Sequence, residues 1–453
     1  MYTIQNLYVS FKKNRIFYLK VNTALYNNCR RHINYDSDNF IIKITSVYKD
    51  QTSTIGPKSK MSKNLTASFF KTLNDYLHFF GVSNLWTEKL DRSGSSVNRR
   101  VSKVITLCLY IFVISETIGF FTQPNLTEKQ SSDRLLLGIS HPILINYYTS
   151  VEYHKEKLKK IIHALSVALK NVYNDQKVER GMIRKSKLYS AAYLFSFSSA
   201  LISYGIDALI QVFMKDGTFT TVITAWPDVE DRSSYANIAR IISYFLWWIF
   251  MTRMSAIYVL VICLTICLSH QYKNLQSYFY HLVEIFDDQD LSQEEKEQKY
   301  EESVKIGIKL HSDTLWCTRE SETACAVVFS GQILVNISVL CLLMLQMVNS
   351  ERTLSNALAT ITTGVTMLIS TGFFMWSAGD VTVEASHLGT AMYSSGWENC
   401  RNDCSIRIRR LLVIAMAQSQ RPVTLRSFGI IELSYQSYVS IVKSSYSVFS
   451  ILY

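Results

Sequence analysis

Long apolar blocks constrain the fold of this chain more than any other feature of its sequence. A transmembrane helix needs about 20 consecutive, mostly apolar residues, and blocks of this length recur along the 453 residues. Charged residues, 18% of the chain, collect between the blocks. The sequence therefore predicts an all-α membrane protein with seven transmembrane helices. The predicted spans are Val104–Phe121, Leu135–Tyr153, Leu188–Met214, Ile238–Leu268, Thr323–Val348, Leu358–Ala378 and Ile430–Tyr453.

Lysine and arginine are distributed unevenly over the segments that join the spans. Residues 154–187, between the second and third spans, carry ten of them. The connection between the first and second spans and the one between the third and fourth spans carry only two each. Basic residues accumulate on the cytoplasmic side of membrane proteins. The N-terminus is therefore predicted to lie in the cytoplasm and the C-terminus outside the cell.

This orientation also accounts for the net charge of +11. No recognition motif accompanies the charge, so no nucleic acid is expected as a partner. The inverted orientation argues against a G-protein-coupled receptor, and a secondary transporter would show internal repeats that this sequence lacks. The nine cysteines, among them Cys400 and Cys404, and the nine histidines form no metal-binding or nucleophile pattern. We therefore expect no metal, no cofactor and no enzymatic activity.

The C-terminal part of the chain holds an ordered set of motifs. A tyrosine and a tryptophan four residues apart follow the sixth span, a Gln-Arg-Pro step precedes the seventh, and a Lys-Ser-Ser-Tyr-Ser-Val-Phe run lies near the end. In this order the motifs resemble those of the insect odorant receptor family. Gustatory receptors, which are related in fold, are the alternative, but their usual Thr-Tyr-x-x-x-x-x-Gln-Phe ending is missing. The resemblance is carried by Tyr393, Trp397, Gln420, Pro422, Lys443, Ser445, Tyr446, Ser447 and Phe449.

The resemblance implies a receptor subunit that binds small, volatile, mostly apolar odorants and gates a non-selective cation channel. Family members generally assemble as tetramers with a shared odorant receptor co-receptor subunit, in the cell membrane of olfactory sensory neuron dendrites. A cytoplasmic anchor domain makes most of the subunit contacts, and the last helix lines the pore. Membrane lipid is the remaining expected partner.

Under this interpretation the chain divides into an extension, an interfacial helix, two groups of spans, two anchor segments and a pore helix. Met61 is followed by residues that resemble an ordinary start for the family, so residues 1–60 are expected to come from a misplaced start codon or to form a disordered tail. The parts are 1–66 (extension), 67–90 (amphipathic interfacial helix), 104–268 (odorant-binding bundle), 269–322 (cytoplasmic anchor), 323–378 (spans five and six), 379–429 (cytoplasmic anchor with the inner part of helix seven) and 430–453 (pore helix).

A polar stripe on the last span predicts a pore lining. Ser440, Ser444, Ser447 and Ile451 are spaced four, three and four residues apart, which places them on one helical face. Small hydroxyls suit a water-filled conduit, and one aliphatic residue at the outer end suits a hydrophobic gate. The family correspondence also places Ile451 at the gate. Helix packing in membranes uses the same spacing and remains the alternative.

The odorant cavity is expected in the outer half of the bundle, where the family places it among helices two, three, four and six. Such a cavity should be mostly apolar with few polar anchors. A membrane tryptophan such as Trp248 also serves as an interface anchor or packing residue. Depth and spacing point to Ile139, Pro142, Ser199, Ile202, Ser203, Ile206, Phe245, Trp248, Thr363 and Met367.

Two smaller features test these expectations. Asn125 opens an Asn-Leu-Thr glycosylation sequon in the first predicted outer loop, whereas Asn64 opens the same sequon on the predicted cytoplasmic side. Only Asn125 is expected to carry a glycan. Before the last span, residues 427–429 read Ser-Phe-Gly where the family usually has Gly-Gly or Gly-Lys, which leaves the loop geometry there open.

Overall fold

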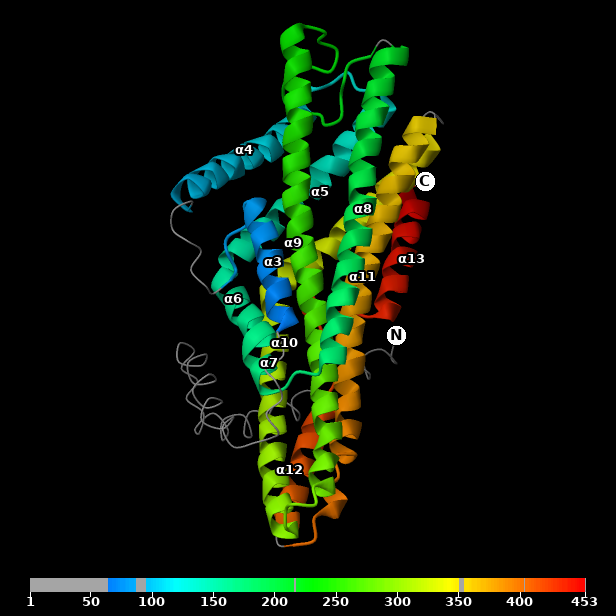
Figure 1. The fold of residues 1–453 in the computed structure, drawn as a ribbon. Coiled ribbons are helices and arrows are strands. Elements are labelled where there is room, and N and C mark those ends of the chain that lie inside the picture. Colours follow the sequence, from blue (N-terminus) through cyan, green and yellow to red (C-terminus); the bar gives the residue numbers. More distant parts are fainter. Residues whose placement is uncertain (1–63, 87–94, 216, 350–353, 403, 453) are drawn as a thin grey trace, which may run out of the picture. The chain divides into compact units, whose positions relative to one another are not determined.

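The structure is a computed structural model that describes residues 64–86, 95–215, 217–349, 354–402 and 404–452. Of the predicted extension 1–66, only the last three residues lie within this part of the chain. The described chain is almost entirely helical, as predicted (Figure 1). The elements are α3 (Leu65–Phe79), α4 (Ser95–Thr122), α5 (Glu128–Tyr153), α6 (Lys155–His163), the π-helix η1 (Ala164–Ala168), α7 (Leu169–Val172), α8 (Gln176–Lys215), α9 (Ser234–His281), the 3₁₀-helix η2 (Leu282–Asp287), α10 (Gln293–Asn349), α11 (Leu354–Tyr393), the 3₁₀-helix η3 (Trp397–Asn399), α12 (Cys404–Ser419), β1 (Arg426–Ser427), β2 (Ile431–Glu432) and α13 (Tyr435–Leu452).

Helices α8 to α11 form the bundle and are much longer than the predicted spans. α9 has 48 residues and α10 has 57. At 1.5 Å per residue α10 is about 85 Å long, against about 30 Å for the hydrocarbon core of a bilayer. The predicted limits at residues 268, 322 and 378 therefore fall inside continuous helices and separate no structural elements. Backbone hydrogen bonding does not require apolar side chains, so these helices continue past the ends of the apolar blocks.

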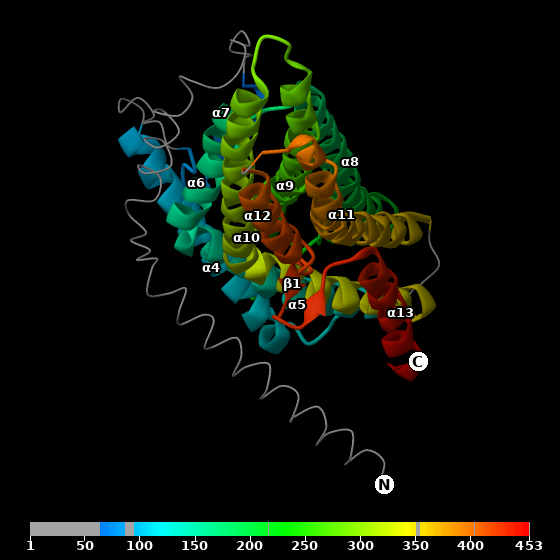
Figure 2. The same ribbon diagram turned by 90° about the horizontal axis from the view of Figure 1, so that it is seen from below.

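The central helix of the bundle is α9. Every residue from Arg253 to Tyr272 is buried, as expected of a helix that is surrounded on all sides by other helices. It packs against α8, α10 and α11, and the view in Figure 2 shows α9 between α8 and α10.

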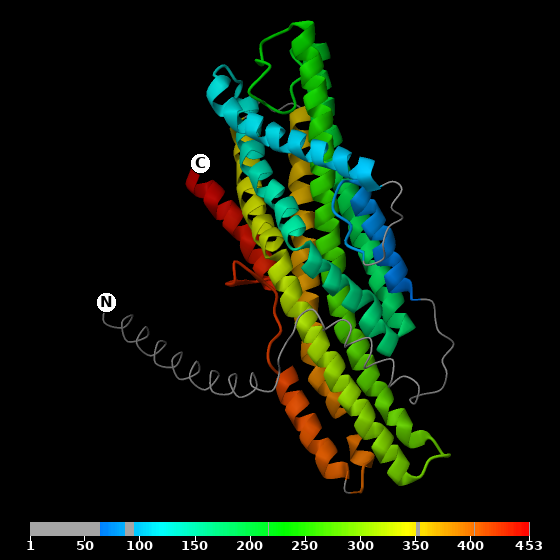
Figure 3. The ribbon, with the colours of Figure 1, turned by 90° about the vertical axis from the view of Figure 1, so that its left-hand side faces the viewer.

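Five described helices are long and apolar enough to cross a membrane: α4, α8, α9, α10 and α11. The second and seventh predicted spans lie on α5 and α13. Both helices fall short of that apolarity because polar side chains such as serine, tyrosine and asparagine or glutamine are interspersed along them. Both helices pack on α10. Figure 3 shows α5 alongside α10 and α4 running obliquely across α5. The count of seven spans stays a prediction.

The predicted amphipathic helix is shorter than residues 67–90. α3 ends at Phe79, and Gly81 turns the chain with a φ of +83°, a conformation that glycine adopts without strain. The Arg253 guanidinium lies so close to Gly81 that a Cβ there would overlap it. Arg253 Nε donates to the Phe80 carbonyl at 2.8 Å, and its Nη1 donates to Thr106 Oγ1 at 2.8 Å. This buried arginine ties α3 and α4 to α9.

A β-hairpin precedes the last helix, so α13 begins at Tyr435 rather than at the predicted Ile430. The turn between β1 and β2 contains Phe428 and Gly429 with φ values of +53° and +68°. The Phe428 N–H donates to Ser330 Oγ of α10 at 3.0 Å. This bond helps to keep Phe428 in the left-handed conformation, which non-glycine residues rarely adopt. It also attaches the turn to α10.

Candidate functional site

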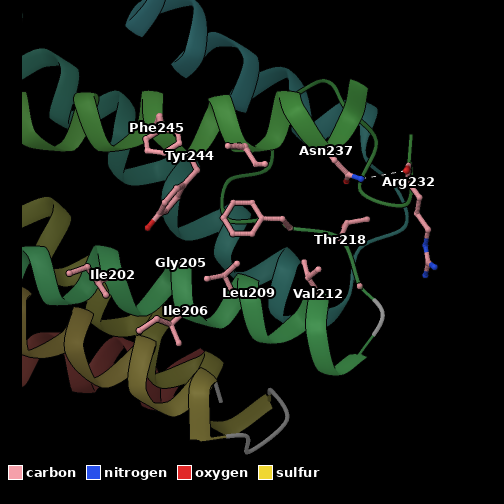
Figure 4. Close-up of a pocket in the computed structure, with 13 residues that line it drawn as sticks. Ile202, Gly205, Ile206, Leu209, Val212, Thr218, Arg232, Asn237, Tyr244 and Phe245 are labelled. Atoms are coloured by element: carbon pink, nitrogen blue, oxygen red, sulfur yellow. Dashed lines mark hydrogen bonds between the residues drawn. The ribbon is translucent and has the colours of Figure 1, made fainter. Parts of the chain in front are cut away.

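A cavity of about 760 Å³ lies between α8, α9 and the loop that joins them (Figure 4). It is found near the C-terminal end of α8 and the N-terminal end of α9, which the charge distribution assigns to the outer side. Its volume is in the range of small-molecule sites. The lining residues are Ile202, Gly205, Ile206, Leu209, Val212, Gly217, Thr218, Phe219, Arg232, Asn237, Ile241, Tyr244 and Phe245.

One face of α8 forms a wall of this cavity. Its lining residues recur at three- and four-residue intervals between 202 and 212, which places them on one helical face. Gly205 leaves room for the facing Tyr244 of α9, because a Cβ at residue 205 would overlap the tyrosine hydroxyl. The Tyr244 ring also meets Phe219 edge to face, with ring centres 5.6 Å apart. The cavity therefore depends on a glycine on one helix and an aromatic ring on the other.

The loop between α8 and α9 roofs the cavity and is held by buried side chains. Gln123, at the end of α4, donates to the carbonyls of Thr224 and Pro227 at 3.2 and 3.0 Å. Arg240 of α9 donates to the carbonyls of Asp228 and Asp231 at 2.6 Å each. These bonds satisfy backbone carbonyls that have no partner in a regular helix or strand. The roof is thus built into the fold before any ligand arrives.

Polar groups gather at the roof end of the cavity, whereas its walls are apolar. Thr218, Arg232 and Asn237 lie there, and Asn237 Nδ2 donates to the Arg232 carbonyl at 3.4 Å (Figure 4). In the same loop, hydrogen bonds from the backbone N–H and hydroxyl of Ser233 lower the pKa of Asp231. An apolar chamber with a few polar groups at one end fits a small molecule that is mostly hydrocarbon with one polar end.

The structure brings together three of the ten predicted pocket residues. Ile202, Ile206 and Phe245 line the cavity. Ser199 and Ser203 share a stripe of α8 with Ile202 and Ile206 but do not line the cavity. Their hydroxyls donate to carbonyls of their own helix at 2.7 and 2.8 Å. The remaining predicted residues, which do not line this cavity, are Ile139, Pro142, Trp248, Thr363 and Met367.

Several lining residues were missed from the sequence. Gly205 and Leu209 continue the spacing that selected Ile202 and Ile206, so the pattern itself could have found them. Phe219 and Asn237 carry no such signal, because only the folding of the loop brings them to the cavity. Among the predicted residues, Thr363 is buried and donates to the Ala359 carbonyl at 2.8 Å.

A buried polar cluster lies behind the cavity and joins three helices. The Trp247 indole N–H of α9 donates to His141 Nε2 of α5 at 3.1 Å. His141 Nδ1 lies 2.7 and 2.9 Å from the two carboxyl oxygens of Glu116 on α4. Since Nε2 accepts from the indole, the proton of the neutral imidazole is on Nδ1 and is donated to Glu116. The cluster explains how Glu116, in the first predicted span, is accommodated away from water.

The predicted pore stripe is exposed in the single chain. Ser440, Ser444 and Ser447 lie on the face of α13 that is turned away from α10 and α11. The hydroxyls of Ser444 and Ser447 donate to carbonyls of their own helix, at 2.9 and 3.1 Å. Packing within this chain therefore does not use the stripe. The side chain of Ile451 lies outside the described residues.

The family-motif residues lie at the end of α11, after α12 and on α13. Trp397 Nε1 donates to the Tyr393 carbonyl at 2.9 Å, and the Arg409 guanidinium of α12 lies 5.6 Å from the Trp397 ring centre. Gln420 and Pro422 follow the end of α12. On α13 the Ser445 hydroxyl is buried and donates to the Ile441 carbonyl at 3.0 Å, whereas Lys443 and Tyr446 are exposed. The described side chains do not include Phe449.

The family described as 7tm Odorant receptor matches residues 148–446, well over half of the chain. The chain belongs to the odorant receptor family. Two structures of the insect olfactory receptor OR5 from Machilis hrabei, one in complex with eugenol, have the same fold. Both have a TM-score of 0.71, are 13% (with eugenol) and 12% identical in sequence, and match 85% of this chain and 97% of theirs. A sequence search of curated proteins found no match.

Family membership confirms the resemblance carried by the C-terminal motifs. This chain is an all-α membrane protein and a receptor for small odorant molecules, not an enzyme. The matched region starts within α5 and ends on α13, so it contains the cavity and, of the predicted pore stripe, Ser440 and Ser444. The region that matches the family therefore includes α8, α9 and the loop between them, whereas Glu116, Gln123 and His141 precede it.

Glycosylation provides a direct test of the orientation of this receptor. Asn125 is exposed in the loop between α4 and α5, so a receptor expressed in insect cells should carry one N-glycan there. Asn64 caps α3, its Oδ1 accepts from the Ala67 N–H at 2.9 Å, and its Nδ2 donates to the Ser166 carbonyl at 2.8 Å. A glycan on that nitrogen would break the second bond. Glycosidase treatment and Asn125→Gln should give the same mobility shift, and a glycan on Asn64 would contradict the predicted orientation.

Proposed function

We propose that this odorant receptor is a subunit of a non-selective cation channel that opens when a small, mostly apolar molecule occupies the cavity between α8 and α9. The observation that carries the proposal is the cavity itself. Its volume of about 760 Å³, apolar walls and polar roof end match the chemistry of a volatile odorant. Occupancy shifts the receptor toward the open state to the extent that the ligand binds that state more tightly.

In this proposal the pore forms only when several subunits assemble around a common axis. The receptor forms a heterotetramer with a co-receptor subunit, with the N-terminus in the cytoplasm, in the membrane of olfactory neuron dendrites. The exposed serine stripe of α13 supports this arrangement, because its hydroxyls face away from the chain's own helices. Four such faces around an axis would line a conduit with small polar groups.

The test is to express the receptor with and without a co-receptor and to record currents across an odorant panel. We expect odorant-evoked cation currents when both subunits are present. A receptor that reaches the cell surface with its co-receptor and responds to no odorant would contradict the proposed function. The panel should include alcohols, esters and aromatic compounds of different sizes, because the cavity volume limits the length of the ligand.

Shortening the gate residue should raise the ligand-independent current. In Ile451→Ala a smaller side chain widens the hydrophobic constriction and makes it easier to wet. We expect a basal current at least severalfold above wild type, measured relative to the maximal odorant-evoked current. Val442→Ala makes a comparable change on the opposite side of α13 and should leave the basal current unchanged. Equal basal currents in Ile451→Ala and wild type would argue against a gate at this position.

A further inference from the structure

One carboxylate of α11 bonds to two other helices. Asp380 Oδ2 accepts from the Lys185 ammonium of α8, and Asp380 Oδ1 accepts from the hydroxyl of Tyr435, the first residue of α13. The side chains of Lys185 and Asp380 are 26% and 22% exposed, so the ion pair is only partly screened by solvent. Each oxygen is therefore committed to a different helix.

The base of α13 rests on α11 through further contacts around Asp380. The Tyr435 ring packs against Gly379, where an added Cβ would come within 3.0 Å of it. One turn further along α13, the Tyr438 hydroxyl donates to the Leu368 carbonyl at 3.3 Å, and its ring lies 5.8 Å from that of Trp376. A shift of α11 at this level must therefore move the start of α13.

The stretch of α11 from Phe373 to Asp380 also packs against α8. Tyr189 of α8 stacks on Phe373 of α11, with ring centres 4.1 Å apart and an interplanar angle of 13°. The Lys185 ammonium lies 5.3 Å from the Tyr189 ring centre. α8 packs on α9 and α11, and α13 packs on α10 and α11. α11 is thus the shared neighbour of the cavity helix and the predicted pore helix.

α8 also carries the wall of the cavity. Lys185 and Gly205 lie on this one continuous helix, about 30 Å apart at 1.5 Å per residue. A helix of this length moves nearly as a unit, so a ligand that displaces the wall between α8 and α9 also displaces Lys185. The bond to Asp380 then passes this displacement to Tyr435.

We propose that Asp380 is a positioning residue that couples occupancy of the α8–α9 cavity to the base of α13. This inference rests on the proposed channel function and adds the route by which the cavity controls the pore helix. The Asp380 carboxylate connects the two helices directly, since Lys185 of α8 bonds to one of its oxygens and Tyr435 of α13 bonds to the other. Removing either bond uncouples the two helices without changing a cavity residue.

The experiment records odorant dose–response curves of Asp380→Asn, Lys185→Met and Tyr435→Phe, each expressed with the co-receptor. Each variant should raise the half-maximal odorant concentration by about fivefold or more, the lower end of typical allosteric coupling. Asp380→Glu keeps the carboxylate and should recover part of the sensitivity. In the Asp380→Asn background, Lys185→Met and Tyr435→Phe should have little further effect, because their shared partner is already lost.

Glu384 offers a matched control one turn along α11. It pairs with Lys273 of α9 at 3.0 Å and accepts from Gln276 Nε2 at 3.1 Å, so it links α11 to α9 instead of α13. Glu384→Gln should change the half-maximal concentration by less than twofold. If Asp380→Asn fails to reach the surface, Tyr435→Phe deletes a single hydroxyl and carries the same expected shift.

The outcomes separate the inference from the proposed function. A wild-type receptor that reaches the surface with its co-receptor and stays silent to every odorant overturns the proposed function and the inference with it. An odorant-gated wild type whose Asp380→Asn and Tyr435→Phe variants respond within twofold of it overturns the inference alone. Equal shifts in Asp380→Asn and Glu384→Gln also overturn it, because any polar contact of α11 would then have the same effect.

Discussion

Replacing His141 with leucine should destabilise the receptor by about 1–3 kcal/mol, the typical effect of leaving a buried acceptor without its hydrogen-bond donor. Glu116 is 3% exposed, and His141 holds both of its carboxyl oxygens. Without the imidazole, the carboxyl group stays buried among α4, α5 and α9 with no donor. The effect should appear as a lower melting temperature of the detergent-purified receptor, followed by fluorescence-detected size-exclusion chromatography.

Two further variants distinguish this explanation from a simple packing defect. His141→Gln retains a donor for Glu116 and should lose much less stability than His141→Leu. The double variant Glu116→Leu/His141→Leu removes the whole pair and should be close to wild type, since apolar replacement of a buried pair is often neutral. If the double variant is as unstable as His141→Leu, the unpaired carboxyl group is not the cause.

Gly205→Ala should raise the odorant concentration for half-maximal current by about tenfold, which corresponds to 1.4 kcal/mol of lost binding free energy. The added Cβ would overlap the Tyr244 hydroxyl, so the tyrosine has to move and reshape the cavity between α8 and α9. None of the described side chains of α13 lines this cavity, so the basal current should not change. Dose–response recordings with the co-receptor measure both quantities.

Another glycine of the same helix provides the control. A Cβ at Gly181 would lie 3.8 Å from His270 Nε2, an ordinary van der Waals contact, so Gly181→Ala should leave the dose–response curve within twofold of wild type. Combining Gly205→Ala with Tyr244→Phe removes the hydroxyl that would clash and should recover part of the sensitivity. An unchanged curve for Gly205→Ala would show that the odorant binds elsewhere.

The sequence predicted part of the candidate site and missed the rest for identifiable reasons. Ile202, Ile206 and Phe245, which were chosen by depth and helical spacing, line the cavity. Ser199 and Ser203 were chosen in the same way and share a helical stripe with Ile202 and Ile206, but their hydroxyls bond within α8 and they do not line the cavity. The roof residues lie in an irregular loop, whose path depends on distant side chains such as those of Gln123 and Arg240.

By itself, the sequence determined the class of this protein. Blocks of about 20 apolar residues can lower their free energy only in a membrane or a large buried core, and the ordered C-terminal motifs identified the odorant receptor family. These signals are local, because each depends on residues that are close together in the chain. They need no knowledge of which helices are neighbours.

The tertiary structure decided which distant residues meet. It extended α9 and α10 beyond the apolar blocks, paired Glu116 with His141, and placed Gly205 against Tyr244. It also put Asp380 between α8 and α13. Such pairs depend on the packing of whole helices against each other, and no local pattern in this sequence encodes which helices become neighbours.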